Sequence, residues 1–216
     1  MTWIKTCGTT NLDDALMSVE AGANALGFVF YEDSPRNVAP EVVREIVAKL
    51  PAKIETVGVF VNESFAFMED VATRVGLSSI QLHYTKLDRD EFSRELRSPI
   101  KTYLSIPASS FSGQPLQFPA DISAVFIDSG SVQQPGGTGQ PFNWQEAASA
   151  AKAIAQAGFN IVVAGGLNSA NVAEAIRILE PWGVDVVSGV ESRPGKKDPD
   201  KVRAFIAAVR QTEKPK

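Results

Sequence analysis

The sequence predicts an α/β fold, a single (β/α)8 or TIM barrel, and three observations lead to this prediction. Short apolar runs of strand length recur eight times along the 216 residues. Each run ends in a Gly or polar turn, and a segment with helical periodicity follows most of these turns. Strands that alternate with helices are parallel and joined by right-handed crossovers, and eight such units favour a closed barrel over an open sheet.

Each predicted strand is a short apolar run. The first four are Trp-Ile-Lys-Thr-Cys-Gly (3–8), Ala-Leu-Gly-Phe-Val-Phe (25–30), Thr-Val-Gly-Val-Phe-Val (56–61) and Ser-Ile-Gln-Leu-His (79–83). The last four are Ile-Lys-Thr-Tyr-Leu (100–104), Ala-Val-Phe-Ile-Asp (124–128), Asn-Ile-Val-Val-Ala (160–164) and Asp-Val-Val-Ser (185–188). The predicted helices lie between them, near 11–21, 40–50, 63–75, 88–97, 144–157, 168–179 and 199–210. The connection after residue 104 is rich in Ser and Pro and has the weakest helical pattern.

Composition places the chain among ordinary globular proteins. Hydrophobic residues make up 44% of the chain and charged residues 21%, which argues against extensive disorder. We expect one catalytic barrel domain over 1–212 and a frayed tail at 213–216. No apolar run approaches the roughly 20 residues that span a bilayer, and the N-terminal segment does not have the pattern of a signal peptide. We therefore expect a cytoplasmic protein.

Charge and cysteine content restrict the partners. A net charge of −4 gives no general attraction to nucleic acid or to an anionic membrane, so we expect neither as a partner. An anionic ligand must then be held by local cations or helix ends. Cys7 is the single cysteine, which excludes an intrachain disulfide. No group of His, Cys and acidic residues has the spacing of a metal site, so we expect no metal.

Candidate functional residues lie where the predicted strands end, because barrel active sites occupy the loops that follow the strands. These positions contain a candidate base, a candidate acid, a fixed cation and two glycine turns. In chain order they are Cys7 with Gly8, Arg36, Asn62, His83, Asp128, Gly165 with Gly166, and Ser188 with Gly189.

The two glycine turns follow the last two strands. Glycine lets backbone N–H groups approach a ligand closely, and a helix N-terminus adds partial positive charge. Gly165 and Gly166 in one turn, and Ser188 and Gly189 in the other, can therefore hold a phosphate group. The alternative is that these are plain turn glycines, and the pairing of the turns favours the phosphate site.

Cys7 and Asp128 are the candidates for proton transfer. Cys7 is either a small buried apolar residue or a general base, since Lys5 lies on the same face of the strand and an ammonium there favours the thiolate. Asp128 follows apolar or small residues, so its carboxyl is either a desolvated proton donor or a turn aspartate in Asp-Ser-Gly. Spacing alone leaves these readings of Asp128 equal, and Cys7 at the same end of the barrel favours the acid.

Three other polar positions have ordinary structural explanations beside functional ones. His83, the single histidine, is a candidate for acid–base catalysis or, as the favoured reading, a hydrogen-bonded residue at the barrel mouth. Arg36 is a solvated loop cation or a partner for a carboxylate or phosphate. Lys196 and Lys197 are expected to form a surface pair, with anion binding as the alternative.

As a set, the motifs of this chain resemble those of the phosphoribosylanthranilate isomerase family of tryptophan biosynthesis. The resemblance spans nearly the whole chain in order, and its motifs are specific together although each alone is weak. They are Lys-Thr-Cys-Gly (5–8), Ser-Pro-Arg (34–36), Val-Gly-Val-Phe-Val-Asn (57–62), Gln-Leu-His (81–83), Asp-Ser (128–129), Gly-Gly-Thr-Gly (136–139), Ala-Gly-Gly-Leu-Asn (164–168), Ser-Gly-Val-Glu-Ser (188–192) and Gly-Lys-Lys-Asp (195–198).

The resemblance implies a cofactor-free Amadori rearrangement of a phosphorylated small molecule, N-(5-phosphoribosyl)anthranilate, to 1-(2-carboxyphenylamino)-1-deoxyribulose 5-phosphate. It implies that Cys7 is the general base, that Asp128 is the general acid and that Arg36 contacts the anthranilate part. The family's phosphate turns fall on Gly165, Gly166, Ser188 and Gly189. We also expect His83 to bind substrate. The segment 136–139 is expected to close over the substrate. Monomers and homodimers are both compatible with this fold.

Two positions depart from the family pattern, and two other functions remain open. Tyr84 stands where the family usually has Gly, and Val187 where it often has Ser, which affects the turn after the fourth strand and one phosphate contact. One alternative function is the histidine-pathway aminoaldose isomerase, which relies on paired aspartates. The other is a barrel that binds a phosphorylated ligand without turnover. Cys7 at the end of the first strand favours the tryptophan-pathway enzyme.

Overall fold

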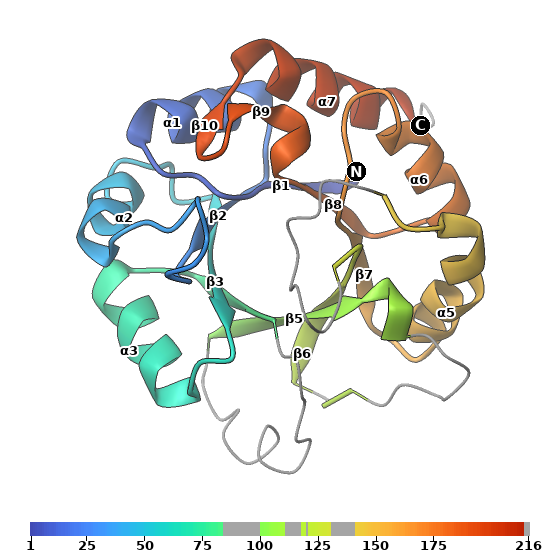
Figure 1. Ribbon diagram of the computed structural model, residues 1–216, viewed down its shortest axis with the longest axis horizontal. Helices are drawn as coiled ribbons and strands as arrows, with labels where there is room; N and C mark the ends of the chain where they lie inside the picture. Colours follow the sequence, from blue (N-terminus) through green and yellow to red (C-terminus); the bar gives the residue numbers. More distant parts are fainter. Residues whose placement is uncertain (84–99, 111–117, 120, 131–140, 214–216) are drawn as a thin grey trace.

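The computed structural model describes residues 1–83, 100–110, 118–119, 121–130 and 141–213 (Figure 1). The helix expected at 88–97, the Gly-rich segment 136–139, Tyr84 and most of the expected tail lie outside the described residues.

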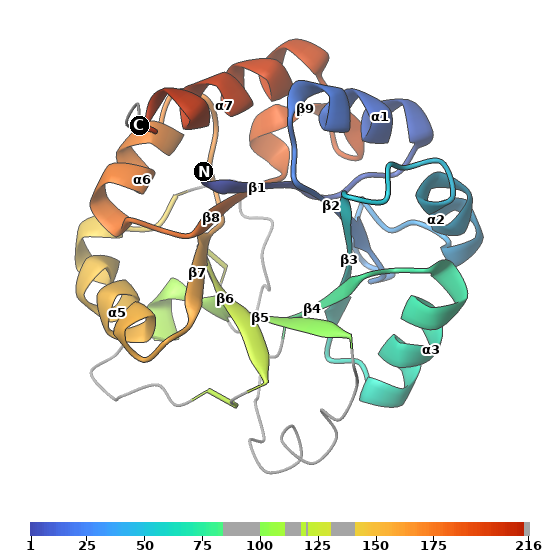
Figure 2. The same ribbon diagram turned by 180° about the vertical axis from the view of Figure 1, so that it is seen from behind.

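Eight parallel strands close into a barrel in chain order, which confirms the predicted fold class (Figures 1 and 2). The barrel closes between the first strand and the last, where Trp3–Thr6 pairs with Gly183–Val186. The strands are β1 (Trp3–Thr6), β2 (Ala25–Val29), β3 (Glu55–Val61), β4 (Ser79–His83), β5 (Lys101–Pro107), β6 (Ile122–Asp128), β7 (Asn160–Val163) and β8 (Gly183–Val186).

Helices surround the barrel, and side-chain caps fix where several of them begin. Asn11, Ser64, Asn143 and Asp198 each accept a hydrogen bond from a backbone N–H of the first helical turn. The helices are α1 (Leu12–Ala21), α2 (Pro40–Val47), α3 (Phe65–Val75), α5 (Trp144–Gln156), α6 (Val172–Leu179) and α7 (Pro199–Gln211). Two short 3-10 helices, η1 (Ala108–Ser110) and η2 (Ser188–Val190), follow β5 and β8.

The predicted helix 168–179 begins four residues late, at Val172. The Oδ1 of Asn168 accepts from the N–H of Ala170, and Oδ1 of Asn171 accepts from the N–H of Asn168. Asn side chains that bond the nearby backbone in this way favour a turn over a helix. The prediction for this segment was therefore right in type and wrong at its start.

The last predicted strand also needs correction. Residues 185–188 were expected to be a strand, whereas β8 ends at Val186 and Ser188 begins the η2 turn. An antiparallel hairpin that the sequence did not predict follows it, formed by β9 (Glu191–Arg193) and β10 (Lys196–Lys197). The hairpin lies over the same end of the barrel as the end of β8 (Figure 1).

The core has two parts, one between the barrel and the helices and one inside the barrel. The inner part is built from side chains that alternate inward along the strands. Its buried apolar members are Trp3, Ala25, Val57, Tyr103, Ala124, Phe126, Val162 and Ala164. Alternate positions run from Trp3 and Lys5 on β1 to Cys7 directly after it, and all three side chains are buried, so the apolar filling gives way to polar groups toward the strand ends. Among the helices of the described residues, none is long and apolar enough to cross a membrane.

Candidate active site

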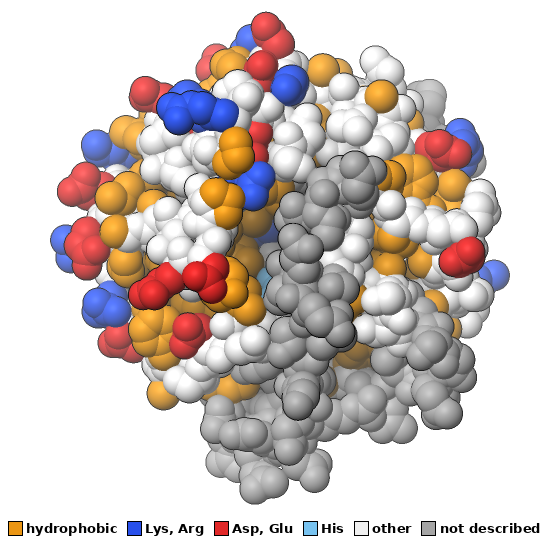
Figure 3. Space-filling model, in the orientation of Figure 1, with side chains coloured by type: hydrophobic (Ala, Val, Ile, Leu, Met, Phe, Trp, Pro, Cys, Tyr) orange, Lys and Arg blue, Asp and Glu red, His pale blue; other side chains and the backbone are white. Residues whose placement is uncertain are grey.

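The end of the barrel where the strands finish carries the predicted site residues. Because the eight strands are parallel, Cys7, His83, Asp128, Gly165 and Ser188 all follow or end strands at this one rim. Charged side chains gather around the outside of this face, over α1, α2, α3 and α7 (Figure 3). Inside the rim, among the described residues, only a few buried charged side chains are close enough to act on the candidate site.

Cys7 lies directly after β1 and is 5% exposed. Its N–H donates to the carbonyl of Val186 at 2.9 Å, which fixes it to the end of β8. A Cβ added to Gly27 on the neighbouring strand would lie 2.5 Å from Sγ of Cys7 and 2.9 Å from Cε of Lys5. The absence of a side chain at Gly27 thus makes room for both groups. Because both lie so close to the same point, the thiol and the lysine stem are neighbours.

Lys5 is completely buried inside the barrel, where its Nζ donates to Oδ1 of Asp185 at 2.9 Å. Its ammonium also lies 5.2 Å from the ring centre of Phe126. Burial lowers the pKa of Lys5, but Asp185 and Cys7 outweigh burial and leave that pKa raised. Lys5 therefore keeps its positive charge beneath the thiol.

The electrostatic environment of Cys7 differs from the expectation. Burial raises the pKa of the Cys7 thiol, while the Lys5 ammonium beside it, and also Lys197, lower that pKa. The predicted effect of Lys5 is correct in direction, but burial is the larger effect and the pKa of the thiol lies above its ordinary value. The two cations limit this rise in the pKa of the thiol but do not cancel it.

Asp128 is the last residue of β6 and is partly buried. Its Oδ1 accepts from the N–H of Gly130 at 2.7 Å, which is the turn geometry expected for an Asp-Ser-Gly segment. Burial raises the pKa of Asp128, opposed by the Gly130 hydrogen bond and by Lys5. Asp128 is therefore a turn residue whose carboxyl is also desolvated, and its role as proton donor stays a prediction.

His83 ends β4 next to a polar group inside the barrel. Its Nε2 lies 3.2 Å from Nε2 of Gln81, and burial together with Lys5 lowers the pKa of His83 to about 4. The imidazole is therefore neutral at physiological pH. Buried Gln81 Oε1 and Ser105 Oγ have no hydrogen-bond partner among the described residues, so this wall of the barrel offers polar groups to a ligand.

The two predicted phosphate turns pack against each other. A Cβ added to Gly189 would lie 1.9 Å from the carbonyl oxygen of Leu167, so only glycine allows this close approach. Within the described part of the chain, the N–H groups of Gly165 and Gly166 find no acceptor. Neither turn leads straight into a long helix, however, because α6 starts at Val172 and the hairpin precedes α7. What the two turns can offer to a phosphate is therefore their backbone N–H groups, and not the N-terminus of a long helix.

Arg36 extends over the end of β1 and is not a solvated loop cation. A Cβ added to Gly8 would lie 2.6 Å from Cδ of Arg36, so the stem of the arginine crosses the backbone beside Cys7. Its Nε donates to the carboxylate of Glu191 at 3.0 and 3.2 Å, and its Nη2 donates at 2.8 Å. The side chain is only 12% exposed.

The expected surface pair Lys196 and Lys197 is wrong for Lys197, whose side chain is 0% exposed. Its Nζ donates to the carbonyl of Cys7 and, at 3.1 Å, to Oε1 of Glu191. Lys196 reaches the carboxylate of Asp14 instead. A buried lysine can satisfy its donors only where acceptors converge, and here barrel closure and the hairpin supply them.

Sequence reasoning missed Asp185 and Glu191. Asp185 stands opposite Lys5 in the register of β1 and β8. A lysine and an aspartate at inward positions of the first and last strands of a closed barrel are a readable signal, because closure makes these strands neighbours. Glu191 gives no such signal, because its partner Arg36 lies 155 positions away and its partner Lys197 reaches it only through an unpredicted hairpin.

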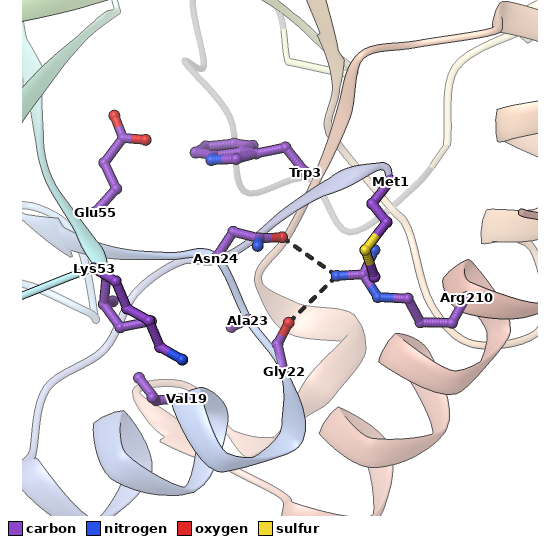
Figure 4. A pocket seen from close by; sticks show the side chains of 10 residues that line it. Met1, Trp3, Val19, Gly22, Ala23, Asn24, Lys53, Glu55 and Arg210 are labelled. Carbon is purple, nitrogen blue, oxygen red and sulfur yellow. Dashed lines mark hydrogen bonds between the residues drawn. The ribbon is translucent and has the colours of Figure 1, made fainter. Parts of the chain in front are cut away.

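No group of three or more His, Cys, Asp or Glu residues suited to a metal ion occurs among the described residues. A pocket of about 480 Å³ opens at the opposite end of the barrel, where the strands begin (Figure 4). Trp3, Asn24, Glu55 and Arg210 line it, and Arg210 donates to the carbonyl of Gly22 and to Oδ1 of Asn24. None of the predicted site residues borders this pocket.

Comparison with known sequences gives a match along nearly the whole chain. A model of the N-(5'-phosphoribosyl)anthranilate isomerase family matches residues 4–208. An N-(5'-phosphoribosyl)anthranilate isomerase of Pelobacter propionicus is 45% identical over 209 residues, which cover 97% of this chain and 96% of the relative.

Solved structures agree with this match. The structure of monomers generated from a dimeric phosphoribosylanthranilate isomerase of Thermotoga maritima is 35% identical, with a TM-score of 0.79, and covers 98% of this chain and 100% of its own. A phosphoribosyl anthranilate isomerase bound to reduced 1-(o-carboxyphenylamino)-1-deoxyribulose 5-phosphate has the same identity, 35%, the same TM-score, 0.79, and the same coverage of 98% and 100%.

Proposed function

The chain belongs to the N-(5'-phosphoribosyl)anthranilate isomerase family, and we propose that it carries out the family's reaction with Cys7 as the general base and Asp128 as the general acid. It is an isomerase of tryptophan biosynthesis that acts on a phosphorylated small molecule. The reaction is the Amadori rearrangement of N-(5-phosphoribosyl)anthranilate to 1-(2-carboxyphenylamino)-1-deoxyribulose 5-phosphate, and its steps are proton transfers within one substrate.

Asp128 begins the reaction in this proposal. Its carboxyl protonates the ring oxygen of the ribose, and the ring opens to a protonated imine. A general acid must hold its proton near neutral pH, and burial raises the pKa of Asp128 in the required direction. The Gly130 hydrogen bond fixes the orientation of this carboxyl.

Cys7 completes the rearrangement. Its thiolate removes the proton from C2 of the imine, which gives an enolamine that tautomerises to the ketone. A base and an acid in one site need environments that separate their protonation states. The Lys5 ammonium lies beside the thiol and favours the thiolate, and this placement is the observation that carries the proposal.

The remaining predicted residues bind substrate. We propose that Gly165, Gly166, Ser188 and Gly189 hold the phosphate through backbone N–H groups, and that Arg36 binds the carboxylate of the anthranilate ring. The N–H groups of Gly165 and Gly166, which have no backbone acceptor among the described residues, support the first assignment. His83, neutral at physiological pH, contributes as a hydrogen-bonding group of the substrate site.

The organisation of the protein follows from this role. We propose one catalytic domain over 1–212, which agrees with the family match to residues 4–208, and a cytoplasmic location, where a charged phosphorylated intermediate is retained. Nucleic acid and membrane are not partners in this proposal, in keeping with the net charge of −4. The chain acts as a monomer or a homodimer.

The test follows the fluorescence of N-(5-phosphoribosyl)anthranilate, generated in place, with the wild type, Cys7→Ser and Asp128→Asn. We expect the wild type to consume the substrate and each variant to lower kcat by about a hundredfold to ten-thousandfold. Circular dichroism verifies that both variants fold. Full activity of either folded variant would contradict the role given to that residue.

A further inference from the structure

A buried cluster of charges joins the hairpin that follows β8 to the backbone of Cys7, and of its members only Arg36 has a role in the proposal above. The cluster consists of Arg36, Glu191 and Lys197. The side chains of Glu191 and Lys197 are 3% and 0% exposed, and that of Arg36 is 12% exposed. Burying three charges is costly unless they are paired and hydrogen-bonded, and here the pairing fixes the position of each of them.

Glu191 holds one edge of Arg36. Its two carboxylate oxygens accept from Nε and Nη2 of the guanidinium at 2.8 to 3.2 Å. A guanidinium is planar and has five N–H donors. It can bind a carboxylate along the edge formed by Nε and one Nη, or along the edge formed by its two Nη atoms. Among the described residues, no group accepts from Nη1. The edge formed by Nη1 and Nη2 therefore remains available for a second planar anion.

Lys197 fixes Glu191 and the active-site backbone together. Its Nζ donates to Oε1 of Glu191 at 3.1 Å, to the carbonyl of Cys7 and, at 3.5 Å, to the carbonyl of Val187. Val187 directly precedes Ser188, a residue of the proposed phosphate turn. One buried ammonium thus joins the base, the phosphate turn and the carboxylate that orients Arg36.

We propose that Glu191 and Lys197 are positioning residues that determine specificity, because they aim the open edge of Arg36 at the ring carboxylate of the substrate. This inference rests on the proposed function, in which Arg36 binds that carboxylate. Gly8 beneath the arginine stem and Glu191 beside its guanidinium hold the group in one orientation. A bidentate contact needs such an orientation, because a misplaced fork makes one hydrogen bond in place of two.

Two ligands test the inference by binding alone. One is reduced 1-(o-carboxyphenylamino)-1-deoxyribulose 5-phosphate, and the other is the same molecule with a phenylamino group that lacks the carboxylate. Calorimetry gives the ratio of their dissociation constants for the wild type, Glu191→Gln, Arg36→Lys and the double variant. Glu174→Gln is the matched control, since it makes the same change in an exposed ion pair with Arg177 on α6.

We expect the wild type and Glu174→Gln to prefer the carboxylated ligand, and Glu191→Gln to reduce that preference about tenfold by loosening Arg36. In the Arg36→Lys background, Glu191→Gln should change the preference little, because the same contact is already lost. A Glu191→Gln variant that weakens both ligands equally, or neither, would overturn the inference. If Glu191→Gln does not fold, Glu191→Asp, which keeps the charge but withdraws it by one methylene, is measured with the same criteria.

Turnover separates this inference from the proposed function. A wild type that binds the carboxylated ligand preferentially but does not consume N-(5-phosphoribosyl)anthranilate contradicts the proposed function, and the effect of Glu191→Gln on the preference still decides the inference. A wild type that turns over the substrate, with a preference unaffected by Glu191→Gln, overturns the inference alone. A wild type without any preference between the ligands overturns it as well.

Discussion

Lys5 and Asp185 stand 180 positions apart in the sequence and form an ion pair inside the barrel, with Nζ 2.9 Å from Oδ1. The pair spans the seam between the first and last strands, directly beneath the thiol of Cys7. The ion pair therefore has two effects: it joins the first strand to the last, and it holds the cation that lowers the pKa of the Cys7 thiol.

Replacing Lys5 should change the ionisation of Cys7. In Lys5→Met, the cation that lowers the pKa of the thiol is gone, so we expect the thiol to titrate at a higher pH and kcat/KM at neutral pH to fall. Because Cys7 is the single cysteine, the difference in ultraviolet absorbance between each protein and its Cys7→Ser counterpart reports on this thiolate alone. Lys152→Met, on the exposed face of α5, is the control. An unchanged thiol titration would exclude this role of Lys5.

The same pair should contribute to stability in an asymmetric way. Lys5→Met leaves the carboxylate of Asp185 buried without its partner, which costs about 3–5 kcal/mol of unfolding free energy. The double variant Lys5→Met with Asp185→Leu removes both charges and should recover most of that loss. Urea denaturation of the single and double variants measures both values. A double variant no more stable than Lys5→Met would show that the unpaired carboxylate is not the cause.

Gly27→Ala should damage catalysis more than it damages binding. The added methyl group would overlap Sγ of Cys7 and Cε of Lys5, so the base must move away from its present position. We expect kcat to fall at least tenfold with little change in KM, since misplacement of a reacting group by about 1 Å has effects of this size or greater. Gly158→Ala is the matched control, because its Cβ would have no neighbour within 4 Å. Its positive φ predicts only a loss of stability.

Gly189→Ala should act on binding of the phosphate. Its Cβ would lie 1.9 Å from the carbonyl oxygen of Leu167, which forces the two glycine turns apart. We expect a higher KM and a weaker affinity for the reduced product analogue, by about tenfold. Gly76→Ala, at the C-terminal end of α3 with its nearest neighbour at 3.8 Å, controls for the same chemical change. An unaltered affinity in Gly189→Ala would remove these turns from the phosphate site.

His83 should make the folded state sensitive to mild acid. Its pKa is about 4 in the folded protein against 6.5 for an unperturbed histidine, so the unfolded chain takes up the proton first as the pH falls. The stability contributed by neutral His83 is complete above pH 6.5 and is lost between 6.5 and 4. At pH 5 we expect the wild type to lose about 1–2 kcal/mol more of its unfolding free energy, relative to pH 7, than His83→Asn. Denaturation at both pH values compares the two proteins, and equal losses would contradict the lowered pKa.

The fold was readable because each strand and helix carries its own pattern. Apolar runs such as 79–83 coincide with the observed strand, and the caps at Asn11 and Ser64 begin helices within two residues of the predicted starts. Boundaries failed where a local side chain competed with the helix, as at Asn168 and Asn171. Patterns along the chain give the type of an element more reliably than its ends.

Residues of the site could be predicted from the sequence only where they directly follow or end a recognisable strand. Cys7 and Asp128 could be named because each follows an apolar run at the functional rim of the barrel. Lys197 could not, since a lysine in a polar segment has the pattern of a surface residue. Its acceptor on Cys7 lies 190 positions away, and its acceptor on Glu191 is brought to it by a hairpin that the sequence did not predict. Glu191 fails for the same reason. Long-range ion pairs depend on closure, and local periodicity contains no information about it.

Because β1 pairs with β8, the first strand to be synthesised must wait for the last strand before the barrel can close. Lys5 leaves the ribosome 180 residues ahead of Asp185, an interval of about 10 to 40 s at usual rates of translation. Until β8 emerges, the nascent chain exposes the thiol of Cys7 and the lysine without the carboxylate that pairs with it. The proposed base is thus among the first residues made and among the last to reach its working environment, and that interval is when the single thiol is open to oxidation.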